Sequence, residues 1–127
     1  MSTVFGVTQL CDAASIAADS TAHAQTGASC PAFEEGVVIL TAASSAAVNL
    51  SIALQVSADG TTWYTSYVHD LQAAQARDIQ AAAVAVAGAS PLNEAALLLK
   101  NAAPWVRIVP TNNGAAAVTL TAQLITR

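Results

Sequence analysis

Large apolar and polar residues alternate most regularly between residues 48 and 56. Every second position there holds a large aliphatic side chain: Val48, Leu50, Ile52, Leu54 and Val56. A period of two is typical of a β-strand that has one face in the core and the other in solvent. The pattern therefore predicts a strand over residues 48–56.

A turn follows this strand closely. Asp59 and Gly60 form an Asp-Gly pair, which readily adopts the positive φ angles of a tight reversal. A segment rich in aromatic and β-branched residues comes next, at 63–68. The sequence predicts a β-hairpin here, with Asp59 and Gly60 as its structural turn.

The end of the chain shows the same arrangement. Residues 105–109 have the composition of a strand, and residues 117–126 place apolar side chains on one face, at Val118, Leu120, Ala122 and Leu124. Asn112, Asn113 and Gly114 lie between the two segments and predict a turn, in which Asn113 and Gly114 are a second favourable pair. The sequence predicts a second hairpin, with Asn113 and Gly114 as its structural turn.

Three other segments are less clear. Residues 37–41 form a short, continuous apolar run, which predicts a strand buried on both faces. Residues 79–87 fit a helix by their alanine content and a strand by their alternation, and we favour a strand because the neighbouring elements are strands. Residues 94–100 are the best candidate for a short helix, although their three successive leucines also fit a buried strand.

These elements predict an all-β protein with at most one short helix. Residues 1–32 have low hydrophobic contrast, so we expect an extended N-terminal arm that contains short strand pieces. Residues 33–127 are expected to form one β-sandwich domain, because short strands recur at intervals of roughly 8–12 residues with turn residues between them. The jelly roll is one form of this fold.

The composition makes the expected surface unusually neutral. Hydrophobic residues make up 54% of the chain, but aromatic residues only 5% and charged residues only 9%, whereas charged residues are about a quarter of an average protein. A surface of Ala, Ser, Thr, Asn and Gln costs little to desolvate against another protein. This favours a permanently assembled subunit, although a GC-rich genome would account equally well for the alanine content.

Charge and hydropathy argue against two classes of partner. The formal net charge is −4, and the four strong cations are dispersed along the chain: Arg77, Lys100, Arg107 and Arg127. A nucleic-acid partner is therefore not expected. No apolar stretch of ~18 residues occurs and the first ten residues do not have the pattern of a signal peptide, so we expect no membrane partner and a soluble protein made in the cytoplasm.

The two cysteines, Cys11 and Cys30, do not have the spacing of a metal site, and no pair of histidines accompanies them. Two buried free thiols are the preferred interpretation. A disulfide between Cys11 and Cys30 remains the alternative if the protein matures outside the cell.

No set of residues has the spacing of a catalytic site, so we predict no enzymatic activity, no cofactor and no metal. His69 and Asp70 are adjacent on a predicted strand and would point to opposite faces. His23 lies in a polar stretch without a second candidate ligand. Glu34 and Glu35 are neighbours in a predicted turn, and such neighbours rarely converge on one substrate atom.

Residues 57–63, Ser-Ala-Asp-Gly-Thr-Thr-Trp, resemble the Asp-box hairpin of sialidase-type propellers. The resemblance covers seven residues and occurs once, so it implies a braced turn and not a glycosidase. It implies that Asp59 accepts hydrogen bonds from backbone N–H groups and that Trp63 packs beneath the turn. Trp63 and Trp105 are both expected to be core anchors.

A wider resemblance covers about the C-terminal two-thirds of the chain. The hairpin over residues 55–64, the strand Trp-Val-Arg-Ile-Val at 105–109, the Asn-Gly turn and the Thr-alternating strand at 118–122 are together similar to small β-sandwich proteins of tailed-bacteriophage virions. Within that group the chain is most similar to capsid decoration (cement) proteins and head-fibre bases.

This resemblance implies a structural virion protein that binds the outside of a phage capsid and stabilises contacts between capsid subunits. The implied partners are the major capsid protein and further copies of the chain, as a homo-oligomer that is often a trimer. The N-terminal arm could order on neighbouring subunits when it binds.

Two alternatives come from other functional classes. A carbohydrate- or receptor-binding module would present an exposed aromatic platform, for which Trp63, Tyr64, Tyr67 and Trp105 are the candidates. A tail, neck or baseplate subunit is the nearest structural alternative, although tube subunits need longer hairpins than those predicted here.

Overall fold

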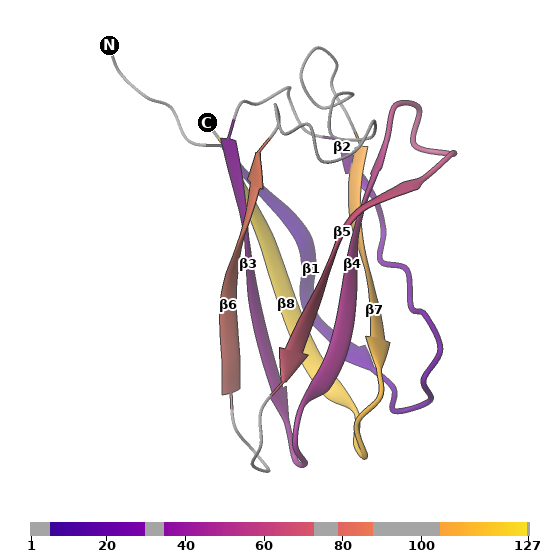
Figure 1. Ribbon diagram of the computed structural model, residues 1–127, viewed down its shortest axis with the longest axis vertical. Coiled ribbons are helices and arrows are strands. Elements are labelled where there is room, and N and C mark those ends of the chain that lie inside the picture. The colour runs from indigo at the N-terminus through magenta and orange to yellow at the C-terminus, as the bar shows by residue number, and fades with distance from the viewer. Residues whose placement is uncertain (1–5, 30–34, 73–78, 88–104, 127) are drawn as a thin grey trace.

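The protein is a sandwich of two antiparallel β-sheets (Figure 1). The computed structural model describes residues 6–29, 35–72, 79–87 and 105–126. The strands are β1 (Gly6–Ile16), β2 (Ala28–Ser29), β3 (Glu35–Ser44), β4 (Asn49–Ser57), β5 (Tyr64–Gln72), β6 (Ile79–Ala87), β7 (Trp105–Asn112) and β8 (Val118–Thr126). The predicted β-sandwich is confirmed, and the described residues contain no helix.

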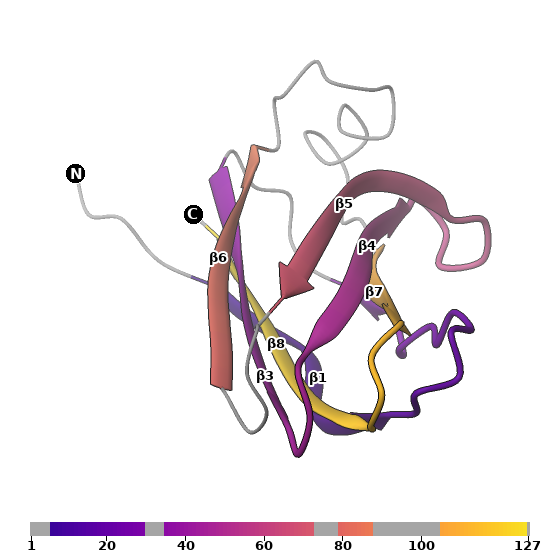
Figure 2. The same ribbon diagram turned by 60° about the horizontal axis from the view of Figure 1, so that its bottom comes forward.

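Each sheet has four strands. One has the order β1-β8-β3-β6 and the other the order β2-β7-β4-β5, and Figure 2 shows the two layers facing each other. Successive strands lie in different sheets at every connection except the one from β4 to β5. Strands that are distant in sequence are therefore neighbours in space.

The first predicted hairpin is confirmed. β4 pairs with β5 from Asn49↔Gln72 to Val56↔Tyr64, with one register shift at Leu54/Gln55. The burial of β4 follows the sequence alternation, since Leu50, Ile52, Leu54 and Val56 are buried and the residues between them are partly exposed.

The second predicted hairpin is wrong. β7 pairs with β2 and β4, whereas β8 pairs with β1 and β3 in the other sheet. The loop at 113–117 thus crosses between the sheets instead of closing a hairpin. Alternation specifies that each strand has one buried face, but it does not specify which strand lies beside it.

β3 differs from its prediction, and β6 agrees with it. The predicted strand at 37–41 lies within β3 but is buried on one face only, because Val38 and Leu40 point into the core while Ile39 and Thr41 are exposed. β6 covers residues 79–87, as predicted, and pairs with β3 along its whole length. The predicted helix at 94–100 lies outside the described residues.

The structure differs most from expectation at the N-terminus. Residues 6–16 form an eleven-residue strand, β1, which pairs with β8 and contributes Leu10 and Ile16 to the core. Residues 19–29, which we call the edge strap, then run along β7. The backbone N–H groups of His23 and Gln25 donate to the carbonyls of Pro110 and Ile108, both at 2.9 Å.

The core between the two sheets is built from small and medium aliphatic side chains. Its largest fully buried members are Ile16, Leu40, Leu50, Ile108, Leu120 and Leu124. No aromatic residue belongs to this core within the part of the chain that the structure describes. The low aromatic content of the sequence thus reflects a core filled by Leu, Ile and Val.

Candidate functional site

The turn between β4 and β5 is braced by side chains, as its sequence predicts. Asp59 Oδ1 accepts hydrogen bonds from the backbone N–H groups of Thr61 (2.8 Å) and Thr62 (2.9 Å). The buried Ser57 hydroxyl accepts from the backbone N–H of Gly60 at 2.9 Å. The hydrogen bonds that Asp59 accepts from the backbone hold its pKa below the usual range, and the bond from Thr62 has the largest effect.

Gly60 is required in this turn for two reasons. Its φ angle is +79°, in the left-handed region that favours glycine. A Cβ atom at this position would lie 3.0 Å from Cε2 of Trp105. The tip of the hairpin therefore rests on the indole ring of Trp105 at the start of β7.

Trp63, just after the turn, is packed between the edge strap and an arginine. A Cβ atom on Gly27 would lie 2.6 Å from Cη2 of Trp63, so the strap backbone touches the ring edge. The guanidinium carbon of Arg107 lies 4.4 Å from the ring centroid, a cation–π contact. Arg107 Nε also donates to Gln55 Oε1 at 2.8 Å, and Gln55 Nε2 donates to Thr65 Oγ1 at 3.2 Å.

Neither tryptophan is a core anchor, contrary to expectation. Both are partly exposed, and neither belongs to the buried cluster between the sheets. On β7, Val106 and Ile108 point inward, so Trp105 and Arg107 point outward. The two indoles instead join loops to the outer surface of one sheet.

The loop after β7 is organised by Asn112, the first residue of the predicted turn, whose buried role the sequence analysis did not predict. The buried Asn112 donates through Nδ2 to the carbonyls of Ile16 (3.0 Å) and Ala116 (2.9 Å), and its Oδ1 accepts from the N–H of Gly114 at 2.9 Å. Asn113, the predicted turn residue, is exposed, and its backbone N–H donates to Asn49. Asn112 could have been suspected, because it occupies an inward position of the alternating pattern of β7.

The edge strap carries an exposed polar cluster. Asp19 Oδ1 accepts from Nε2 of His23 at 2.8 Å and from the N–H and hydroxyl of Thr21 at 3.0 and 2.8 Å. These hydrogen bonds lower the pKa of Asp19 to about 2, and the bond with His23 has the largest effect. The cluster fixes the strap locally, and the described residues include no group of three metal-ligating side chains.

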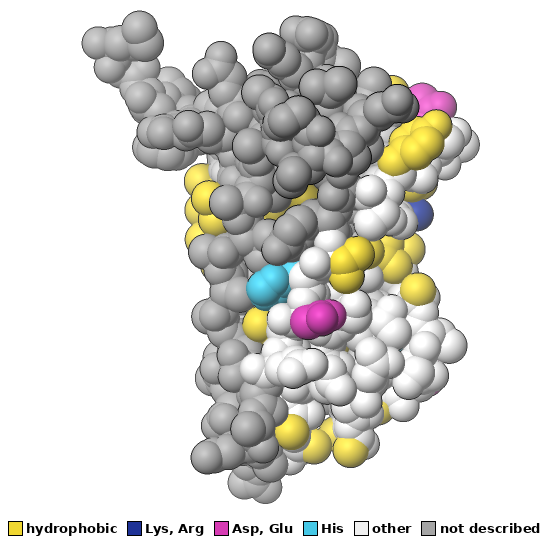
Figure 3. Space-filling view, in the orientation of Figure 1, with side chains coloured by type: hydrophobic (Ala, Val, Ile, Leu, Met, Phe, Trp, Pro, Cys, Tyr) yellow, Lys and Arg dark blue, Asp and Glu magenta, His cyan; other side chains and the backbone are white. Residues whose placement is uncertain are grey.

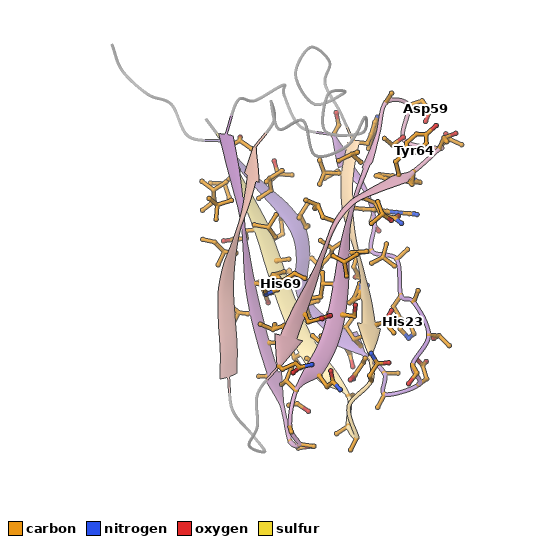
Figure 4. All side chains as sticks on the ribbon, viewed as in Figure 1. His23, Asp59, Tyr64 and His69 are labelled. Carbon is orange, nitrogen blue, oxygen red and sulfur yellow. The ribbon has the colours of Figure 1, made fainter. Side chains whose placement is uncertain are left out.

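The remaining titratable residues within the described part of the chain do not converge. His69 pairs with Ile52, whereas the neighbouring Asp70 pairs with Ser51 and is exposed. Figure 4 shows His23 on the strap and His69 on β5, well separated from Asp59 at the hairpin tip. Cys11 is a buried free thiol whose pKa is raised by burial, while Cys30 and Glu34 lie outside the described residues.

The most extensive candidate surface is the outer face of the β1-β8-β3-β6 sheet. Its outward positions on β3 and β8 alternate with the buried residues and hold Val37, Ile39, Thr41, Ala43, Thr119, Thr121, Gln123 and Ile125. None of these is charged. Val7 on β1 extends the surface, because it pairs with Ile125, and it is 63% exposed.

A space-filling view of one side of the molecule gives the same impression of neutrality. In Figure 3, white and yellow atoms dominate among the residues that are not grey, and dark blue and magenta atoms are scarce.

Among the described residues, no helix is long and apolar enough to cross a membrane.

Comparison with known proteins identifies the fold but not a family. No family model and no curated protein matches the chain. A chain in a structure of the Gt strain of infectious bursal disease virus is similar with a TM-score of 0.56 and 8% identity, over 96% of this chain and 32% of that chain. A chain from the Gx strain gives a TM-score of 0.50, with 8% identity and coverages of 96% and 31%.

The chain therefore spans about one third of the length of these viral chains. At such low identity the likeness shows a shared β-sandwich fold and nothing more. It places the fold of this chain among those found in virus structures.

Proposed function

We propose that this chain is a structural protein of a virus particle, and that it binds the outside of a tailed-bacteriophage capsid and stabilises contacts between capsid subunits. The observation that carries the proposal is the run of uncharged outward positions on β3 and β8, at residues 37–43 and 119–125. Such a face can be buried against protein at little cost in desolvation. No catalytic step is needed for this role.

The strand order supports the proposal. The orders β1-β8-β3-β6 and β2-β7-β4-β5, with a change of sheet at nearly every connection, are consistent with an eight-stranded jelly roll. This form of sandwich recurs in viral capsid domains, although lectins and cupins also use it. We therefore infer the jelly-roll form and treat the fold as support for the role, since a fold by itself does not determine a function.

The proposed partners are the major capsid protein and further copies of the chain. The chain would sit on the capsid exterior after synthesis in the host cytoplasm. Residues 6–29 are not proposed as an extended arm that contacts the capsid, because they build β1 and the edge strap.

The test is binding to phage heads that lack this protein. Purified protein is mixed with undecorated heads of the phage that encodes it, and the bound fraction is measured by sedimentation. Binding that saturates and raises the temperature at which the heads release DNA supports the proposal. A protein that stays in the supernatant at micromolar concentration overturns it.

Paired variants locate the contact. Ile39→Lys places a charge among the uncharged outward positions of β3 and β8, and Thr111→Lys places one on a partly exposed position of β7 in the other sheet. We expect Ile39→Lys to weaken head binding at least tenfold and Thr111→Lys to change it little. Equal effects of the two variants would mean that the outer face is not the contact surface.

A second candidate function is glycan or receptor binding. It is favoured by Tyr64, which is 52% exposed beside the Asp59 turn. One face of Trp63 is already covered by Arg107, so Tyr64 is the better platform for stacking on a sugar. Glycan binding that is lost in Tyr64→Ala, by a protein that does not bind heads, would establish this alternative.

A further inference from the structure

The two sheets have four edge strands, and three of them have features that block pairing with another chain. β1 has two register shifts against β8 and a left-handed residue, Ala13, at φ +49°. β2 is only two residues long. β5 has a register shift and carries the exposed Asp70. Bulges, short length and charge are the usual protections of a sheet edge.

β6 has none of these protections. It is nine residues long and pairs with β3 without a register shift, from Glu35↔Ala87 to Ala43↔Ile79. Its sequence, Ile-Gln-Ala-Ala-Ala-Val-Ala-Val-Ala, contains no charged residue, no proline and no glycine. No described strand pairs with its other edge, which forms the margin of its sheet in Figures 1 and 2. A regular, apolar edge of this kind is a template for a further strand.

We propose that β6 pairs antiparallel with β6 of a second copy of this chain. The four-stranded β1-β8-β3-β6 sheets of the two copies would then form one continuous eight-stranded sheet across the dimer. Two arguments favour a second copy of the chain as the partner of this edge. β6 has no charged residue, so two copies of it can pair without repulsion. An antiparallel pair of identical strands also has the self-complementarity that a two-fold interface requires. A pairing centred on Ala83 sets Val84 opposite Ala82, so a larger residue meets a smaller one.

This inference deepens the self-association within the proposed function. It replaces the trimer that the family resemblance implied with a two-fold contact, and it does not depend on binding to a capsid. The uncharged faces of β3 and β8 would continue across the two copies, which doubles the neutral surface available to a larger partner.

The experiment measures the native mass of the full-length protein and of variants that carry a positive or a negative charge at Ala83, the centre of β6. We expect wild type to be a dimer and Ala83→Lys and Ala83→Asp each to be monomers, because like charges would meet across the two-fold axis. An equimolar mixture of the two variants should recover a dimer that contains one copy of each. Thr119→Lys, at an exposed position of β8, is the matched control and should remain a dimer.

Recovery in the mixture also shows that the variants fold. If neither variant folds, amide hydrogen exchange of wild type decides: the β6 amides that do not bond to β3 should be protected in the dimer and lose protection at least tenfold on dilution to monomer. A wild-type monomer, a trimer, a dimer unaffected by Ala83→Lys, or a dimer with unprotected β6 amides overturns the inference. A dimer that does not bind heads would leave the β6 contact intact and overturn only the proposed function.

Discussion

Two polar side chains, Asp59 and Asn112, organise loops at opposite ends of the sandwich. Both accept hydrogen bonds from backbone N–H groups that would otherwise be unpaired in a turn. They differ in burial, since Asp59 is exposed whereas Asn112 is fully buried. Loss of a buried hydrogen-bonding group costs more free energy than loss of an exposed one, so the two residues should differ in their effect on stability.

Asn112→Ala should lower the free energy of unfolding by about 1–3 kcal/mol, because it leaves the carbonyl of Ile16 without its donor inside the protein. Asn113→Ala is the matched control at the next position, where the side chain is exposed, and should change stability by less than about 0.5 kcal/mol. Chemical denaturation measures both. A larger loss in Asn113→Ala would show that the turn depends on the residue that the sequence indicated.

A second prediction at this scale concerns the edge strap. The Asp19 carboxyl should titrate with a pKa of about 2 in NMR spectra. His23→Ala should raise that pKa but leave it below the usual value near 3.8, because the bonds from Thr21 remain. His69→Ala, on β5, serves as the control and should leave Asp19 unchanged.

The sign of the linked stability effect follows from this lowered pKa. The Asp19 carboxylate stabilises the folded state above the pKa of the unfolded chain, about 3.9. That contribution is lost as the pH falls from about 4 towards 2. An Asp19 pKa near 4 in wild type would contradict the hydrogen-bonded cluster.

At the scale of elements, β1 is the strand whose role differs most from expectation. It lies at one edge of its sheet, pairs with β8 and buries Leu10, Cys11 and Ile16. Its two register shifts break the regular alternation, which explains why the sequence pattern at the N-terminus has low contrast. An N-terminal segment with buried large side chains is a structural part of the sandwich.

Ile16→Ala should therefore destabilise the protein by about 2–5 kcal/mol, the usual cost of removing a fully buried aliphatic side chain. Val7→Ala lies on the same strand, but Val7 is 63% exposed, so the change should cost less than about 0.5 kcal/mol. Thermal or urea unfolding distinguishes the two. Equal, small effects would mean that β1 is an arm and not a core strand.

For the molecule as a whole, non-local pairing is the main feature. Of the six strand pairs among the described residues, only β4 with β5 joins neighbours in the chain, while β1 pairs with β8 and β2 with β7. The sandwich cannot close until the two ends of the chain meet. Loop closure must therefore precede most of the stabilising contacts.

Refolding should accordingly be slow, with a main phase on the scale of milliseconds to seconds. Stopped-flow tryptophan fluorescence is a suitable measurement, because Trp63 and Trp105 both lie where the β4–β5 hairpin meets other elements. Complete refolding within microseconds would be inconsistent with this topology.

The sequence by itself determined much of the local structure of the described residues outside the N-terminal segment. The strands at 48–56 and 117–126 and the Asp-Gly turn follow from the period of the side chains and the conformational needs of the turn, whereas the strand at 79–87 is inferred from its neighbours. The β-sandwich class follows from their number and spacing. The neutral surface could also be inferred, because so few residues of the chain are charged.

Only the tertiary structure decided how these strands pair and what their outer faces do. The alternation of apolar and polar residues along β7 and β8 would be the same whether the two strands formed a hairpin or lay in different sheets. The tryptophans appear apolar in sequence, yet both lie outside the core: Trp105 points outward from β7 and contacts Gly60, and Trp63 contacts Gly27 of the edge strap. Side-chain period specifies which face of a strand is buried, whereas partner and register depend on contacts between residues far apart in the chain.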